Sequence, residues 1–159
     1  MKQKLTLILA LNVVVLALLG GFYLYQTKQY DFKTLAGHKF QHSALKDDII
    51  VVNYFAEWCA PCLREIPELN AFHQQAPQNV TLFAISYDNL NIAQLELLKK
   101  KYAIQFPIIH ELRTPFTFDK PEYLPATFIL GKDGQLVKQL LGEQTVASLN
   151  KAIAPLQNP

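Results

Sequence analysis

The sequence predicts an α/β domain built on a mixed sheet, preceded by one N-terminal transmembrane helix. Three observations predict it: an uncharged apolar run over residues 5–25, apolar strand-like runs at 48–56 and 79–88, and helical periodicities that alternate with them. The chain has 159 residues, 50% of them hydrophobic, and a formal net charge of +2. These values fit one globular domain and give no argument for binding nucleic acid.

The apolar run at residues 5–25 is long enough to cross a membrane. At about 1.5 Å of rise per residue, it spans a hydrocarbon core about 30 Å thick. A cleaved signal peptide and a buried core helix are the alternatives, but a signal peptide usually has an apolar region of only about 7–15 residues. Two lysines before the run favour a cytoplasmic N-terminus. We therefore expect a cytoplasmic segment at 1–4, a retained anchor at 5–25 and a linker at 26–31.

Residues 32–159 have the length and patterning of one further domain. Runs rich in β-branched residues indicate strands that are buried on both faces, and glycine-containing turns indicate hairpins. In chain order we expect a hairpin at 32–45, a strand at 48–56, a helix at 60–75, a strand at 79–88, a helix from 91, a strand at 106–110, a hairpin at 126–141 and a helix at 145–154.

The helix that begins after Asn91 has a recognisable start. Asn91 can cap it, and Gln94 stands three residues later, as in a capping box. Its expected apolar face contains the residues at helical spacing, namely Ile92, Leu95, Leu98 and Tyr102.

The chain contains only two cysteines, Cys59 and Cys62, in the segment AEWCAPCLREIP. Haem attachment would need a histidine after the second cysteine, and Leu63 stands there. A structural zinc site usually takes four ligands from two paired motifs, so we expect no metal. A permanent structural disulfide stays open as an alternative, but closing so short a loop stabilises little. A redox-active dithiol, which needs no cofactor, is the interpretation that the surrounding residues favour.

Cys59 falls at the predicted junction between a strand and a helix. The unpaired N–H groups and the positive end of the helix dipole favour a thiolate at this place. A dipole interaction of about 0.3–2 kcal/mol lowers a thiol pKa by about 0.2–1.5, which brings it toward neutral pH. Cys62 lies one turn further into the helix, so we expect it to be more buried and to act as the resolving thiol.

The segment VVNYFAEWCAPCLREIPELN, residues 51–70, resembles the active-site segment of the thioredoxin superfamily. Within that superfamily it is most similar to the TlpA/ResA/DsbE (CcmG) type of membrane-anchored thiol-disulfide oxidoreductase. The shared features are Trp58, the Cys-Ala-Pro-Cys motif and Pro67, and the resemblance continues at YLPATFIL, where Pro125 takes the place of the family's cis-proline. The resemblance covers residues 31–155 and implies a thioredoxin-like three-layer sandwich with a mixed central sheet.

The resemblance also implies roles for individual residues. Cys59 would be the nucleophile and Cys62 the resolving thiol. Asn53 occupies the strand position where thioredoxin keeps a buried aspartate, and Glu65 matches the acidic residue that ResA-like proteins hold near their cysteines. A partly buried carboxylate there would raise the thiol pKa values and move protons for Cys62. A solvated position on the helix surface remains the alternative for Glu65.

Substrate binding is also assigned by resemblance. Trp58 would lie at the rim of the site and limit access to Cys59, with a plain core position as the alternative. The backbone of Leu124, before Pro125, would pair with an extended substrate strand. The family commonly has a short helix before the cis-proline, but residues 111–124 contain two prolines and no helical period. We expect this segment to border the active-site groove, so substrate choice does not carry over.

The expected function is thiol-disulfide exchange by a single-pass protein of the bacterial inner membrane, with its domain in the periplasm. The resemblance implies a reductant that receives electrons from a membrane thiol transporter and reduces a disulfide in apocytochrome c. One alternative is a disulfide oxidase or isomerase, or a reductase of other envelope proteins. Another, from a different class, is a non-catalytic redox-sensing or chaperone-like binding module.

Overall fold

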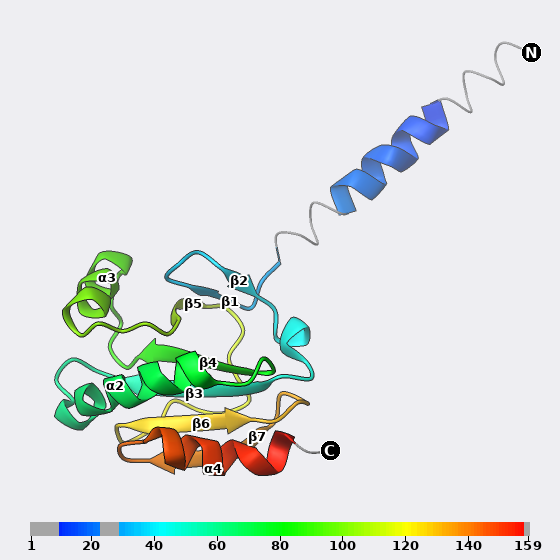
Figure 1. Cartoon of the computed structure of the whole chain (residues 1–159). Helices are drawn as coiled ribbons and strands as arrows, with labels where there is room; N and C mark the ends of the chain where they lie inside the picture. Colours follow the sequence, from blue (N-terminus) through cyan, green and yellow to red (C-terminus); the bar gives the residue numbers. More distant parts are fainter. Residues whose placement is uncertain (1–9, 23–28, 158–159) are drawn as a thin grey trace, which may run out of the picture. The chain divides into compact units, whose positions relative to one another are not determined.

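The computed structural model describes residues 10–22 and 29–157, and the chain divides into two compact units, Met1–Tyr30 and Asp31–Pro159 (Figure 1). In the first unit, residues 10–22 are helical. Among the described residues, no helix combines the length and the apolar character needed to cross a bilayer. The predicted anchor at 5–25 also includes residues 5–9 and 23–25, which lie outside the described residues.

A seven-stranded sheet forms the centre of the second unit (Figure 1). The strands are β1 (Phe32–Thr34), β2 (Lys39–Phe40), β3 (Ile49–Phe55), β4 (Val80–Ser86), β5 (Ile108–Leu112), β6 (Ala126–Leu130) and β7 (Leu136–Leu141). They lie side by side in the order β2-β1-β5-β4-β3-β6-β7. β4 pairs in parallel with both β3 and β5, whereas the other neighbouring pairs are antiparallel. The predicted mixed sheet is therefore confirmed.

Three helices cover one face of this sheet: α2 (Ala60–Gln75), α3 (Ile92–Lys101) and α4 (Val146–Gln157). β3, β4 and β5 are consecutive neighbours joined by parallel crossovers. Because such crossovers are right-handed, α2 and α3 fall on the same face. Buried side chains from all three helices belong to one hydrophobic cluster, which also contains both cysteines.

The opposite face is covered by an aromatic cluster and, among the described residues of the second unit, by no α-helix. The 3-10 turn η1 (His42–Leu45) and the irregular residues 113–125 contribute Leu45, Phe116 and Phe118 to it. The expected three-layer sandwich is thus only partly correct, since the second outer layer is not helical. The chain passes from β5 to β6 through a segment whose phenylalanines pack directly on the sheet.

The central strand β3 separates these two faces. All seven of its residues are buried, as its continuous apolar run predicts. Ile49 and Val51 belong to the cluster under the helices, whereas Ile50 and Val52 belong to the aromatic cluster. By the same alternation, Asn53 points to the helical face, which is also the face of the cysteines.

Most of the predicted elements are present. The β1–β2 and β6–β7 hairpins and the capping box of α3 are confirmed. The prediction for Ile92 is wrong, because its side chain is 53% exposed. Only Leu95 and Leu98 of α3 are buried, so packing begins one turn after the helix does. The last helix continues past the predicted end at residue 154 to Gln157.

Candidate active site

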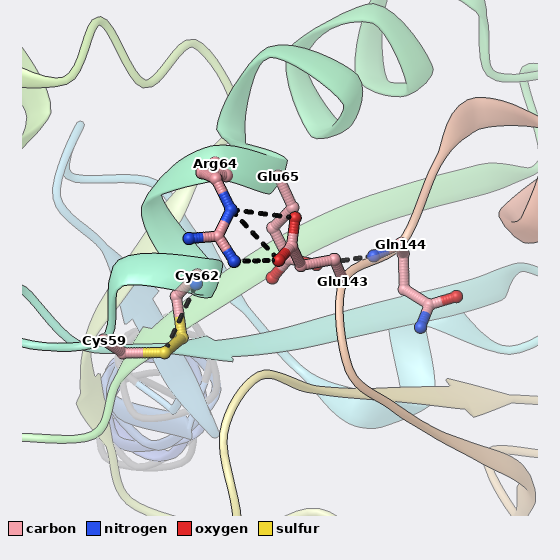
Figure 2. Close-up of polar contacts among 6 residues, drawn as sticks. All are labelled: Cys59, Cys62, Arg64, Glu65, Glu143 and Gln144. Carbon is pink, nitrogen blue, oxygen red and sulfur yellow. Dashed lines mark hydrogen bonds and ion pairs between the residues drawn. A yellow bond between two sulfur atoms is a disulfide. The ribbon is translucent and has the colours of Figure 1, made fainter.

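The cysteine pair lies where β3 passes into α2, as predicted. Cys59 is the N-cap residue of α2, and its Sγ accepts a hydrogen bond from the backbone N–H of Cys62 at 3.3 Å. The two residues form a disulfide, with 5.3 Å between their Cα atoms (Figure 2). Both are buried, and Cys62 is the more buried of the two. The structure therefore represents the oxidised form of the pair.

The first turn of α2 presents backbone N–H groups to the sulfur of Cys59. The first N–H groups of a helix have no partner within the helix, and the Cys62 N–H already points at the Cys59 sulfur. Pro61 stands in the first turn, where its missing N–H removes no helical hydrogen bond. A thiolate at Cys59 would keep this hydrogen bond and gain from the helix dipole.

Glu65 is buried, which decides between the two interpretations that its sequence position left open. Its side chain is only 1% exposed and lies one turn after Cys62 on α2. One carboxylate oxygen accepts from Asn53 Nδ2 at 2.8 Å. The other accepts from the backbone N–H of Gln144 at 2.9 Å (Figure 2). Burial raises the pKa of Glu65 to about 7, although the two hydrogen bonds act in the opposite direction.

Asn53 connects this carboxyl group to the sheet. Its Nδ2 also donates to Thr127 Oγ1 on β6 at 3.1 Å, and all three side chains are buried. The amide oxygen of Asn53 has no hydrogen-bond partner among the described residues. An asparagine at this position donates to the carboxylate, whereas an aspartate would place a second negative charge beside it.

Trp58 lies on the surface next to Cys59, so a core position is excluded. Its side chain is 65% exposed, and its Nε1 donates to the Asp88 carboxylate at 3.0 Å. The indole ring makes an edge-to-face contact with Tyr87, at 6.0 Å between centroids. Lys120, from the irregular segment before β6, donates to the Tyr87 carbonyl at 2.8 Å. That segment therefore reaches the surroundings of Trp58.

Pro125 has the cis configuration that the resemblance implied. The β3–β6 register pairs Tyr54 with Ala126, so Pro125 lies level with the carboxyl end of β3, where the cysteines follow. Pro125 is buried and Leu124 half-buried. The carbonyl oxygen of Pro125 accepts from the Gly142 N–H at 2.9 Å.

Sequence reasoning did not identify the segment that follows β7 as part of the site. Gln144 acts through its backbone N–H, which any residue but proline would supply, so no side-chain pattern marks it. Arg64 lies on the surface, where it forms an ion pair with Glu143 of the same segment (Figure 2).

The comparisons with known proteins agree with this geometry. The AhpC/TSA family matches residues 25–139. The chain is 30% identical over 118 residues to a thiol-disulfide oxidoreductase ResA of Bacillus cereus, covering 72% of this chain and 67% of that protein. It is 26% identical over 182 residues to ResA of Bacillus thuringiensis (strain Al Hakam), covering 98% and 100%.

A solved structure supports the fold. The thioredoxin-family thiol:disulfide interchange protein from Chlorobium tepidum TLS superposes with a TM-score of 0.63 at 24% identity, covering 78% of this chain and 90% of that one. Fold, cysteine pair and relatives thus point to one class of enzyme. The chain belongs to the AhpC/TSA family and is a thiol-disulfide oxidoreductase of the ResA type.

Proposed function

We propose that this protein is a membrane-anchored reductant of protein disulfides on the periplasmic side of the inner membrane. The observation that carries the proposal is the buried Glu65 carboxyl group, one helical turn after Cys62. A group with a pKa of about 7 can both accept and return a proton near neutral pH.

The first step uses the reduced form of the pair. The Cys59 thiolate attacks one sulfur of a substrate disulfide, so a bond forms between Cys59 and the substrate while the substrate S–S bond breaks. The departing substrate thiolate takes a proton from water. The helix N-terminus favours the thiolate before the attack, and the product is a mixed disulfide.

The second step releases the substrate. The Cys62 thiol gives its proton to the Glu65 carboxylate and attacks the sulfur of Cys59. The mixed disulfide breaks, the Cys59–Cys62 disulfide forms, and the second substrate sulfur leaves as a thiolate that is protonated. Two electrons have then passed from the dithiol to the substrate, and the enzyme has reached the disulfide form of Figure 2.

An extended client segment would bind along the backbone of Leu124 as an added strand beside Pro125. Tyr123, the exposed neighbour of Leu124 in the sequence, and Trp58, the exposed neighbour of Cys59, would contact the client. By resemblance to the ResA type, the client is a disulfide of apocytochrome c before haem attachment.

Return to the dithiol needs two electrons from outside the chain. By the same resemblance, a membrane thiol transporter supplies them. Residues 5–25 would anchor the chain in the inner membrane, with the thioredoxin-like domain in the periplasm, where a dithiol must be kept reduced. A reporter fused after the C-terminus tests this location, because it should be active only if it lies outside the cytoplasm.

The reduction potential of the Cys59–Cys62 pair tests the direction of electron flow. We expect the full chain, equilibrated with glutathione, to give a value below about −220 mV, whereas a value near −120 mV would make it an oxidant. The Cys62→Ser variant should trap the client as a mixed disulfide with Cys59, which identifies the client directly.

The Cys59→Ser variant distinguishes an enzymatic function from that of a non-catalytic binding module. We expect it to lose disulfide reduction completely in cells and in a purified assay. The double variant Cys59→Ser/Cys62→Ser is the control for non-covalent capture of the client. Full cellular function of the single variant would contradict the enzymatic proposal and favour a redox-independent binding role.

A further inference from the structure

The segment between β7 and α4, residues 142–145, reaches the buried carboxyl group of the active site. Its Gln144 N–H donates to Glu65 at 2.9 Å. The neighbouring residue, Glu143, accepts from Arg64 Nε through both carboxylate oxygens, at 3.1 and 3.3 Å, and pairs with the terminal guanidinium nitrogen as well. Figure 2 shows the two contacts side by side, from two successive residues of α2 to two successive residues of the segment.

The two ends of this segment are fixed by other contacts. At one end, the Gly142 N–H donates to the Pro125 carbonyl at 2.9 Å. At the other, the Val146 N–H donates to the Glu68 carboxylate on α2 at 2.8 Å. The Arg64–Glu143 pair lies between these two points. The Gln144 side chain, which donates to the Gly142 carbonyl and accepts from Ser148 Oγ, both at 2.9 Å, also holds this part of the segment. Breaking the ion pair would therefore loosen the middle of the segment only in part and leave the fold intact.

The ion pair has little value as a stabilising contact. Arg64 is 62% exposed and Glu143 41% exposed, and exposed ion pairs contribute little to stability. Because the Arg64–Glu143 pair lies beside the buried Glu65 carboxyl group, its charges can change the pKa of Glu65. The negative charge of Glu143 raises the pKa of Glu65, in addition to the larger effect of burial. Arg64 partly cancels that charge, because its fork-shaped guanidinium binds both oxygens of Glu143.

We propose that Arg64 is a positioning residue for thiol-disulfide exchange: by pairing with Glu143 it holds the Gln144 N–H against the Glu65 carboxylate and sets the protonation equilibrium of that carboxyl group. The inference rests on the proposed function for its catalytic meaning, because only that function gives Glu65 a proton to transfer. The contacts themselves are independent of it.

The groups around Glu65 allow the sign of the effect to be worked out. The charged groups are Arg64 and Glu68 on α2 and Glu143 on the segment, while β3 and β6 present the neutral Asn53 and Thr127. Removing the Arg64 charge leaves Glu143 uncompensated and loosens a hydrogen bond that favours the carboxylate. Both changes favour the protonated form of Glu65.

The test is a pH titration of the Glu65 carboxyl carbon by NMR in the oxidised full chain, with Glu65→Gln used to assign the signal. In Arg64→Gln we expect the pKa of Glu65 to rise by roughly 0.5–1, the size expected for one uncompensated charge near the surface. Arg64→Lys keeps the charge and should show less than half of this rise. The Tm should move by no more than a few degrees.

Arg113→Gln is the matched control. It breaks an ion pair with Glu111 of similar exposure, far along the chain from Glu65, and should leave the titration of Glu65 unchanged. A pKa of Glu65 in Arg64→Gln within about 0.3 of the wild-type value would overturn the proposal. A full rise in Arg64→Lys would also overturn it, because the charge would then have no part in the effect.

Exchange kinetics separate this inference from the proposed function. The pH profile of the Cys62-dependent release step should move with the pKa of Glu65 in the Arg64→Gln variant. If the pKa rises while that profile stays in place, the positioning of Glu65 by Arg64 stands, and the proposed proton transfer by Glu65 is contradicted.

Discussion

The two faces of the central sheet bury different chemistry. Under the helices lie the disulfide, the Glu65 carboxyl group, and the neutral polar side chains of Asn53 and Thr127. On the opposite face, the described residues form a cluster of stacked and edge-to-face aromatic rings without a buried carboxyl group. Both faces share β3, whose side chains alternate between them.

The difference indicates a division of roles between the faces. Aromatic packing removes large apolar areas from water without burying a carboxyl group, so the contribution of this face should vary little with pH until Tyr54 ionises, at a pKa that burial raises. Burying a carboxyl group costs free energy whenever it is ionised. On the helical face, burial of Glu65 therefore lowers the stability of the domain near neutral pH and places a proton-binding group one turn after Cys62.

The largest effect on stability should come from the aromatic face. Phe32 is fully buried, and its ring contacts Phe40, Phe83 and Phe116 with centroids 5.1–5.5 Å apart. We expect Phe32→Ala to lower the free energy of unfolding by about 3–5 kcal/mol, because the substitution removes all these ring contacts and leaves a cavity. Unfolding of the oxidised wild type and variant by denaturant measures this change in the free energy of unfolding.

The same variant tests whether the faces are independent. Below its unfolding transition, Phe32→Ala should leave the pH profile of Cys59 alkylation in the reduced protein unchanged. Phe32→Leu serves as the milder control for lost packing volume. If Phe32→Ala shifted the alkylation profile, the aromatic face would take part in the chemistry and the proposed division would be wrong.

A smaller effect, and one that depends on pH, is expected for Glu65→Gln. The native state raises the pKa of Glu65 from 4.5 to about 7, so between these pH values it keeps a proton that the unfolded chain has released. The free energy of unfolding therefore falls as pH rises through this range, by about 3 kcal/mol from this group. In the Glu65→Gln variant, this decrease in the free energy of unfolding should be absent.

Unfolding at several pH values from 4 to 9 checks this prediction as the difference between variant and wild type, which removes the contribution of other groups. Glu96→Gln, at an exposed position on α3, is the control and should follow the wild type. A difference between Glu65→Gln and wild type that does not vary with pH would mean that burial of the carboxyl group has no energetic consequence.

The smallest effect on stability is expected at the rim. Trp58→Phe removes the hydrogen bond from Nε1 to Asp88 at an exposed position, so the free energy of unfolding should change by less than about 1 kcal/mol. Trp58→Ala should increase the alkylation rate of reduced Cys59 several-fold if the indole limits access. Asp88→Asn keeps the ring and should leave the rate near the wild-type value.

Much of the site could be predicted because its chemistry is local in the sequence. Cys59 and Cys62 follow a buried apolar run and precede a helical pattern, which places them at a helix N-terminus. Asn91 and Gln94 form the expected capping box through contacts within four residues. Resemblance supplied the cis peptide at Pro125, which local propensity alone does not indicate.

Other features depended on contacts between distant parts of the chain. Ile92 has the right helical spacing for the core, yet it is exposed because only the later turns of α3 pack on the sheet. Residues 113–125 form no helix, in agreement with the two prolines and the missing helical period noted for this segment, and Phe118 stacks on Phe128 instead. The exposure of Ile92 and this ring contact do not follow from periodicity, because both depend on which element lies opposite.

The sequence by itself determined the order of strands and helices, the place of the dithiol at the start of α2 and the enzyme class, because each rests on short-range spacing of residue types. Only the tertiary structure decided that Glu65 is buried and which groups meet its two oxygens. One partner, Asn53, comes from the neighbouring strand, and the other is the N–H of Gln144, 79 residues later. A backbone N–H carries no side-chain signature, so only the folded arrangement could reveal it.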